Sequence, residues 1–285
     1  QPDDVRAFLV QTSILKRLSG ELCDTVTGRH NGAAMLAALH GANAMIVALD
    51  EKGRWYRYHH LFADLLRARL RQAVPSEEVA ALHRRAAAWH AHHGLPLQAI
   101  DHALAAKDFD GAARLVEQNA YQVLTRGELS TLLRWIALLP PDVVQRHPLA
   151  LVSQAWALAL TGAVQQVDPL LRQVESSIEA GPDGQGADDS PAARELLGNA
   201  AAIRAFFAMM ASAYPQALHL AERADALLPA HTIHARWLLP YIRGAAHRGQ
   251  GRYEEAAAAF ARVAQVISSP CTWPTWATGV TEVAL

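Results

Sequence analysis

Two stretches near the end of the chain repeat each other, and this repeat constrains the fold more than any other feature. SAYPQALHLAERADALLP and GRYEEAAAAFARVAQVISSP each carry an aromatic residue, a small residue three positions later and a final proline. The interval from Tyr214 to Tyr253 equals the interval from Ala217 to Ala256. Such a period is typical of arrays of helical hairpins, in which each unit buries its apolar face against the next. The pattern therefore predicts stacked pairs of helices.

Two weaker copies precede these stretches, one around Val164 and one around Phe109 with Ala112. The step from Val164 to Tyr214 is longer than the interval between the two tyrosines, but it contains AGPDGQGADDSP, residues 180–191. A segment rich in Gly, Asp and Pro is typical of a flexible insertion, and removing it restores the period.

Small residues also recur on the helix that precedes each copy. Gly244, Ala205 and Ala155 occupy the matching place in three units. Two helices approach to about 8–10 Å only where their facing side chains are small. We therefore expect a tetratricopeptide-like superhelix of helix pairs over residues 79–285, irregular over 79–147 and clearer over 148–285.

The segment that precedes residue 79 changes its period several times. DDVRAFLVQTSIL, SGELCDTVTG and NGAAMLAALHGAN read as three short helices, with Ser19 capping the second, and Asn31 and Gly41 bounding the third. MIVALD and WYRYH then flank EKGR, which is the signal of a β-hairpin. Three helices and a hairpin are the order of a winged helix, so we expect a mostly α chain with a winged-helix domain over residues 1–78.

A fourth helix is expected from His59 onward. Leu61, Leu65, Leu66 and Leu70 would form its apolar stripe, with the arginines at 67, 69 and 71 largely off it.

Composition excludes several classes of protein. Hydrophobic residues make up 51% of the chain, charged residues 19%, and the formal net charge is -1, which fits neither a disordered acidic segment nor a basic nucleic-acid binder. Cys23 and Cys271 lie too far apart for a metal or disulfide framework, so we expect a cytoplasmic protein. The uncharged run from His147 to Val167 contains Ser153 and three glutamines, which favours a buried helix over a membrane span.

The beginning QPDD shows no secretory signal, and the absence of an initiator methionine and the abrupt end at TEVAL suggest a piece of a longer protein.

The sequence lacks the minimum motifs of several enzymes. A phosphate-binding loop needs a Gly-Lys pair, but none of the three lysines, Lys16, Lys52 and Lys107, follows a glycine. HExxH and GxSxG are also absent. We therefore expect no catalytic residues and no enzymatic activity in this chain.

Histidines are the remaining route to an enzyme, because the chain has 14 of them. WHAHHG places His90 and His93 on one helix face, with only His102 and Asp101 nearby as further ligands. A metal enzyme is therefore the least favoured alternative, and histidines that bond the last carbonyls of a helix are favoured over it. Trp273 and Trp276 in CTWPTW are similarly interpreted as the start of another helix pair rather than as a stacking platform.

Two long stretches resemble a known family. RWYRYHHLFADLLRARL and ALHRRAAAWHAHHGLPLQAIDHALAAKDFDGAARLVE are similar to the MalT-like family of large ATP-dependent LuxR-type transcriptional regulators, as are FLVQTSILKRLSGELCDTVTG and GELSTLLRWIALLPPDVV. The resemblance covers residues 3–165 by motif and the remainder by type of repeat.

The resemblance implies a signal-transduction ATPase of several domains, of which this chain holds the winged helix and the helical-repeat sensor. ATP or ADP would be bound by an N-terminal module outside this chain, so no cofactor is expected here. The implied partners are that nucleotide-binding module and an inducer, either a small molecule or a regulatory protein, with no direct contact to DNA or membrane.

The resemblance also implies a role for two histidines. In related nucleotide-switch ATPases a Met-His-Asp motif ends the winged helix, and its histidine contacts the β-phosphate of ADP in the resting state. Tyr58, His59 and His60 are similar to that motif, with His60 in the place of the usual Asp. His59 and His60 are therefore the candidate residues for sensing the nucleotide state. The competing interpretation is that His59 caps the following helix or packs under the wing.

Two functions of different classes stay open. In the first, the repeats bind an inducer or partner on their inner face, and usual repeat geometry places six residues there: Trp156, Asn199, Phe206, Met209, Tyr241 and Arg248. In the second, the winged helix binds DNA and the repeats mediate oligomerisation. The third helix, which would enter the major groove, contains no Lys or Arg, and this disfavours the second function.

Overall fold

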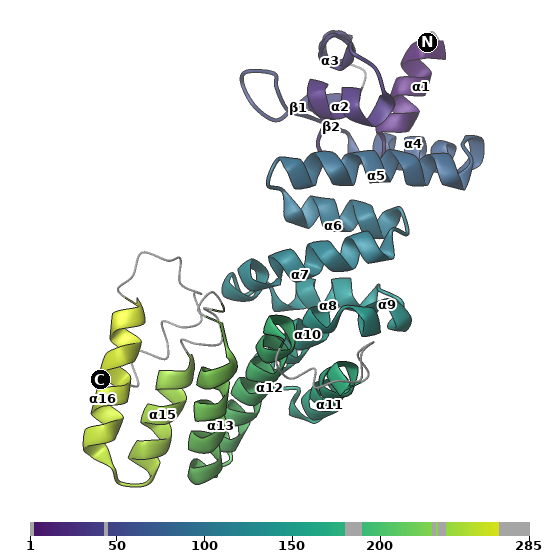
Figure 1. Cartoon of the computed structure of the whole chain (residues 1–285). Coiled ribbons are helices and arrows are strands. Elements are labelled where there is room, and N and C mark those ends of the chain that lie inside the picture. Colours follow the sequence, from purple (N-terminus) through teal and green to yellow (C-terminus); the bar gives the residue numbers. More distant parts are fainter. Residues whose placement is uncertain (1–2, 43–44, 180–189, 230–231, 233–237, 268–285) are drawn as a thin grey trace. The chain divides into compact units, whose positions relative to one another are not determined.

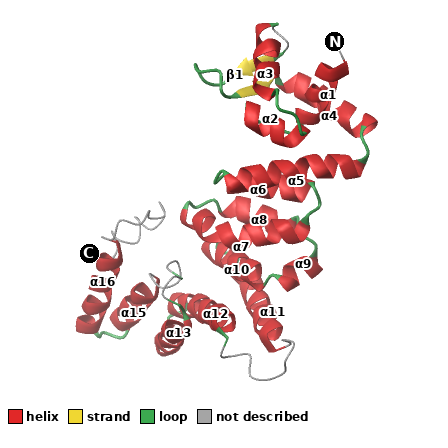
Figure 2. Cartoon of the chain, turned by 45° about the horizontal axis from the view of Figure 1, so that its top comes forward, coloured by secondary structure: helices red, strands yellow, loops and turns green. Residues whose placement is uncertain are grey.

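The computed structural model describes residues 3–42, 45–179, 190–229, 232 and 238–267, and helices dominate this part of the chain (Figures 1 and 2). The chain forms two compact units, residues 1–115 and 116–285. The predicted insertion at residues 180–191 lies almost wholly outside the described residues, as do Trp273 and Trp276.

The first unit begins with the predicted winged helix. Its elements are α1 (Asp3–Thr12), α2 (Gly20–Thr27), α3 (Gly32–Gly41), β1 (Ile46–Ala48), β2 (Tyr56–Tyr58) and α4 (His60–Ala73). β1 and β2 pair antiparallel, with Ile46 opposite Tyr58 and Ala48 opposite Tyr56. Leu18 and Tyr56 exchange two further backbone hydrogen bonds of 2.8 and 2.9 Å, which fasten the hairpin to the segment before α2.

Local side-chain bonds explain where these helices begin. The Oγ of Ser19 accepts a hydrogen bond from the backbone N–H of Leu22, as predicted for the cap of α2. Asn31 precedes α3 as predicted, but its side chain makes no capping bond. Instead, Asp24 accepts a 2.7 Å bond from the N–H of Gly32, so α2 supplies the cap of α3.

One prediction for α4 is wrong. Leu66 and Leu70 are buried together with Ala63, but Leu61 is 68% exposed and Leu65 is 61% exposed. An α-helix places Leu61 and Leu65 more than a quarter turn away from the buried face, so four leucines do not share one stripe.

Two more helices of the first unit follow the winged helix. They are α5 (Ser76–His92) and α6 (Pro96–Ala105), which pack against each other. α5 also packs on α2. Figure 1 shows α5 lying between the winged helix and α6. The long α7 (Phe109–Thr125) then spans the border between the two compact units.

The second unit is wholly helical where it is described. Its elements are α8 (Leu129–Ala137), α9 (Pro141–Arg146), α10 (Pro148–Leu160), the 3-10 turn η1 (Val164–Gln166), α11 (Val167–Glu179), α12 (Pro191–Met210), α13 (Tyr214–Leu227), α15 (Leu238–Gly249) and α16 (Tyr253–Ile267). α10 packs on α11, α12 on α13 and α15 on α16, and α13 packs on α15. These consecutive helix pairs confirm the predicted mostly α repeat fold, while its superhelical path stays a prediction.

Small residues lie where the helices of a pair approach closely. A Cβ at Gly244 would lie 2.6 Å from the ring of Phe260, so α15 and α16 meet at this glycine. Ala205 and Ala155, in the matching place, are fully buried. The ring of Tyr214 fills the space that a side chain at Gly249 would need. The small residues of the repeat therefore lie at close contacts between helices, as the steric argument expects.

Two helix boundaries follow from the residues at them. Tyr214 begins α13, because Pro215 fits the first helical turn. The break at residues 106–108, between α6 and α7, was not predicted, because Ala, Lys and Asp are not strong turn signals. Lys107 adopts a φ of 56° there, a conformation more typical of glycine.

The uncharged run after His147 forms α10, a buried helix as predicted. Among the described residues, no helix has both the length and the apolar character needed to cross a bilayer.

Candidate functional site

His59 lies at the junction between β2 and α4. Its backbone N–H donates a 2.8 Å hydrogen bond to the carbonyl of Met45, which ties the junction to the other strand of the hairpin. His59 occupies the N-cap position of α4, but its ring makes no capping hydrogen bond. The ring is exposed and lies 4.4 Å from the ring of His60, which is also exposed. His59 therefore caps α4 through its backbone, with its carbonyl accepting a 2.9 Å hydrogen bond from the N–H of Ala63, as the competing interpretation expects, but its exposed ring does not pack under the wing.

The residue before His59 is firmly held. Tyr58 is buried, and its hydroxyl lies 2.7 Å from the Oγ1 of Thr12 on α1. Burial raises the pKa of Tyr58 above its ordinary value, so this hydroxyl stays protonated. The ring also meets the edge of Phe62 at 5.8 Å. The side chains of His59 and His60 are therefore exposed, while the backbone at the junction is held by the hydrogen bond to Met45 and by the contacts of Tyr58.

Exposed apolar side chains flank the two histidines in the chain. We call the following residues the wing face: Met45, Val47, Leu49, Leu61 and Leu65. Arg57, also exposed, stands opposite Val47 in the hairpin. These residues lie on β1 and its flanks and on α4.

Three of the six residues predicted for the inner face of the repeats lie in the core. Trp156, Asn199 and Met209 are buried. The indole N–H of Trp156 donates a 3.0 Å hydrogen bond to Oδ1 of Asn199, and the amide of Asn199 donates to the carbonyl of Glu195 at 2.8 Å. The first of these bonds joins α10 to α12, and the second lies within α12.

The other three are more accessible. Phe206 and Tyr241 are half-buried and Arg248 is exposed. Tyr241 lies 6.1 Å from the ring of Phe260, and the guanidinium of Arg248 lies 5.8 Å from the same ring. Tyr241 and Arg248 therefore form one group on α15 with Phe260 of α16, whereas Phe206 lies on α12.

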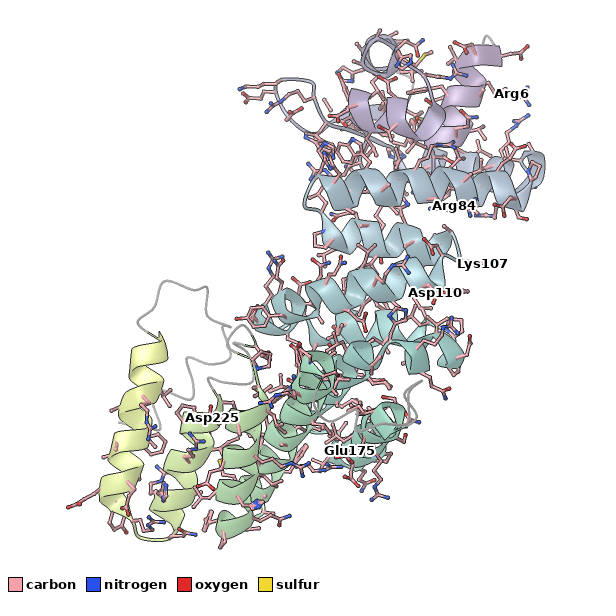
Figure 3. All side chains as sticks on the ribbon, viewed as in Figure 1. Arg6, Arg84, Lys107, Asp110, Glu175 and Asp225 are labelled. Atoms are coloured by element: carbon pink, nitrogen blue, oxygen red, sulfur yellow. The ribbon has the colours of Figure 1, made fainter. Side chains whose placement is uncertain are left out.

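Two arginines of the second unit were not predicted from the sequence. The interval from Arg204 to Arg243 is the period of the repeat, the same as that from Tyr214 to Tyr253. Arg204 donates to Glu175 at 3.1 Å, and Arg243 donates to Asp225 at 3.1 Å. Figure 3 labels the two acceptors, Glu175 on α11 and Asp225 on α13. Each pair joins the first helix of a repeat to the second helix of the preceding repeat, so the period itself could have identified them.

Two histidines of the predicted group, His90 and His102, form a cluster with His83, which was not predicted, and this cluster lacks the geometry of a metal site. Nδ1 of His83 and Nδ1 of His102 are 2.9 Å apart, so one ring must donate and the other accept. His90 stacks on His102 with ring centroids 5.3 Å apart. Among the described residues no three histidines, cysteines or carboxylates are arranged to hold a metal ion.

Burial, the largest cause, lowers the pKa of His102 to about 3 and that of His90 to about 4. The cluster is therefore neutral at pH 7. The ring of His93, by contrast, lies 2.8 Å from the carbonyl of Trp89 near the end of α5, which is the arrangement favoured for these histidines in the sequence.

Comparison with known proteins identifies the first domain. The family model described as the MalT winged helix domain matches residues 1–78. These residues form a MalT winged helix domain. Its boundaries coincide with the residues for which the helix and hairpin pattern predicts a winged helix.

Most of the remaining chain is similar to the same regulators. The HTH-type transcriptional regulator MalT of Serratia proteamaculans is 30% identical over 253 residues, which cover 89% of this chain and 27% of the regulator. MalT of Yersinia pestis is 31% identical over 252 residues, which cover 88% of this chain and 27% of the regulator. The chain is therefore MalT-like, as its motifs indicated, and it spans about a quarter of the length of these MalT relatives.

A second kind of relative is similar to part of the chain. The serine/threonine-protein kinase PknK of Mycobacterium tuberculosis is 35% identical over 179 residues, which cover 60% of this MalT-like chain and 16% of the kinase.

Proposed function

We propose that this chain is a regulatory part of a cytoplasmic transcription regulator. Its winged helix senses the nucleotide held by another module of the parent protein, and its helical repeats receive an inducer or a partner protein. The two events are linked by a shift of the population between a resting and an active state. Two widely separated cysteines and the likeness to MalT regulators support this proposal.

The position of His59 is the observation that carries the proposal. Its exposed ring stands at the N-terminus of α4, where backbone N–H groups without helical partners and the helix dipole favour an anion. An imidazole N–H donates readily to a phosphate oxygen. The chain has no phosphate-binding loop, so the nucleotide would be bound by the other module and would meet only the edge of this domain.

The wing face supplies the contact that such sensing requires. A phosphate bound in another module reaches His59 only when that module docks beside it. Leu61 and Leu65 offer apolar area for this docking on the same helix that carries His60. We therefore place the interface with the nucleotide-binding module on the wing face.

The helical repeats provide the receptor surface in this proposal. Stacked helix pairs present an extended surface without needing catalytic groups. Tyr241 and Arg248 combine an aromatic ring with a cation near Phe260, an arrangement suited to a ligand with an apolar part and an anionic part. A thermal-shift screen of this chain with sugars, phenolics and amines tests this role, because a bound ligand raises the melting temperature by mass action.

The sensor role is tested in the intact regulator by His59→Ala. Loss of a hydrogen bond to a charged phosphate costs about 1.5–3 kcal/mol, so ADP affinity should fall by about tenfold or more. Transcription without inducer should rise, because the resting state is weakened. His30→Ala is the matched control, because His30 is also exposed in the winged helix but lies before α3. Unchanged ADP affinity and basal transcription in His59→Ala would exclude the sensor role.

A further inference from the structure

The hairpin of the winged helix touches α5 through a pair of indole rings. Trp55, just before β2, meets Trp89 of α5 edge to face, with ring centroids 6.4 Å apart. The guanidinium of Arg17 lies 5.0 Å from the centroid of Trp55. Aromatic and cation–π contacts of this kind stabilise the packing beyond the burial of apolar area.

A carboxylate from α2 bonds the same part of α5. Oε1 of Glu21 accepts a 3.3 Å hydrogen bond from the indole N–H of Trp89 and lies 3.3 Å from Nε2 of His93. His93 stacks on Trp89, with centroids 3.8 Å apart and an interplanar angle of 18°. In addition, Arg85 donates a 2.7 Å bond from α5 to the carbonyl of Val26 at the end of α2.

From Trp89 the contacts continue into α6. The ring of His90 lies 5.2 Å from Trp89, nearly perpendicular to it, and stacks on His102 of α6. His102 is in turn bonded to His83 on α5. On the surface, Lys16 forms a 3.2 Å ion pair with Asp101, so the segment that carries Arg17 also contacts α6 directly.

We propose that these side chains, which we call the indole–imidazole network, couple α6 to the hairpin that carries His59. The members of the network are Arg17, Glu21, Trp55, Trp89, His90, His93, His83 and His102. A displacement of α5 or α6 is then transmitted to Trp55. Trp55 is connected to His59, four residues further along the chain, by β2, which pairs with β1 on one side and with Leu18 on the other. The network would be the route from the helical repeats to the nucleotide sensor, and this regulatory role rests on the proposed function.

The extent of the first compact unit supports this proposal. The MalT winged helix domain ends at residue 78, but the unit continues to residue 115 and includes α5 and α6. The two buried imidazoles, His90 and His102, also suit a permanent connection rather than one that breaks near neutral pH, because burial keeps both uncharged. We therefore expect α5 and α6 to respond together with the winged helix.

Amide hydrogen exchange of the whole chain tests the coupling. Trp55→Leu removes the network contact at the hairpin but leaves α6 unaltered in sequence. Amides of residues 96–105 should then exchange at least about threefold faster than in the unsubstituted chain, because three successive ring contacts connect Trp55 to His102 of α6. Val47→Ala is the control, since Val47 lies on the same hairpin but is exposed and outside the network; it should leave α6 unchanged.

Faster exchange that is confined to the hairpin in Trp55→Leu, or equal effects of the two substitutions on α6, would overturn the proposal. If circular dichroism shows that Trp55→Leu is unfolded, Trp55→Phe provides the same comparison with an aromatic ring retained. In the intact regulator, Trp55→Leu should weaken the response to inducer while ADP affinity is kept. The ADP affinity of His59→Ala tests only the proposed sensor role, whereas hydrogen exchange of α6 in Trp55→Leu tests only the coupling by the network. A failure of one hypothesis can therefore be distinguished from a failure of the other.

Discussion

The contacts inside the first compact unit differ in kind from the contacts inside the second. In the first unit, large and chemically distinct side chains such as Trp55, Trp89 and His102 meet once each, and none of these contacts is repeated. In the second unit, alanines and glycines lie at the helix contacts, and the ion pairs of Arg204 and Arg243 recur with the period of the repeat. Contacts that occur once can hold a single site in place, whereas contacts that recur with each repeat allow helix pairs to be stacked into a surface whose length depends on the number of repeats. The difference agrees with the proposal of a nucleotide sensor in the first unit and an inducer or partner surface in the second.

The largest expected effect comes from breaking the core of the first unit. Phe8→Ala should lower the free energy of unfolding by about 3–5 kcal/mol, because Phe8 is fully buried and its removal leaves a cavity. Urea denaturation measures this loss. Leu61→Ala is the comparison on α4 and should change stability by less than about 0.5 kcal/mol, because Leu61 is exposed. A large loss in Leu61→Ala would show that the apolar stripe predicted from the sequence is correct after all.

Acid should destabilise the first unit through the histidine cluster. The pKa values of His102 and His90 are about 3 and about 4 in the folded chain, below the unfolded value near 6.5, so the unfolded state binds more protons between these limits. Stability is therefore complete above about pH 6.5 and falls as the pH drops toward 4, by on the order of 1–2 kcal/mol per pH unit.

The charged and titratable groups that act on this cluster are His83, His93, Asp101 and Lys16. His102→Leu tests the assignment, because it removes one titrating group while keeping an apolar side chain. Urea denaturation at several pH values should give a shallower slope for this variant below pH 6.5. Identical slopes for the two proteins would show that other groups cause the acid loss.

An intermediate effect is expected at the close helix contact of the second unit. Gly244→Val should destabilise the chain by about 1–3 kcal/mol, because a new side chain would overlap the ring of Phe260. Gly41→Ala is the matched glycine control, since a Cβ there meets nothing within 4 Å. Thermal unfolding of both variants measures the difference, and a tolerated Gly244→Val would mean that α15 and α16 do not approach as described.

The smallest effect is expected for the repeated ion pair. Arg243→Met should cost about 1 kcal/mol, because the half-buried arginine bonds both Asp225 and the carbonyl of Ala221. Arg252→Met removes an exposed pair with Glu255 and should cost less than about 0.5 kcal/mol. If the two variants were equally stable in urea, the repeated pair would have no structural role.

The sequence predicted the parts of the fold that depend on local pattern. The helix and hairpin order of the winged helix follows from changes of period, and the pairs α12–α13 and α15–α16 follow from the spacing of Tyr214 and Tyr253. The turn at residues 106–108 was missed because its positive φ falls on Lys107 instead of a glycine. The face of α4 was misjudged because leucine alone does not say which side is covered.

The candidate site was only partly predictable for a related reason. His59 was found by its likeness to a motif, and its exposure agrees with the role given to it, which stays a prediction. Trp156 and Asn199 were expected on an open face, but they bond each other in the core across 43 positions of the chain. The indole–imidazole network joins Trp55 to His102 through Trp89, and no period or motif links residues so far apart.

Hydrogen exchange of the hairpin in the intact regulator tests the central claim most directly. Residues 45–60 would be followed with and without ADP, in the unsubstituted regulator and in His59→Ala. The account predicts that ADP slows exchange of these residues at least about threefold in the former and has no effect in the latter. Equal protection by ADP in both proteins would contradict the claim that His59 connects the nucleotide to the winged helix.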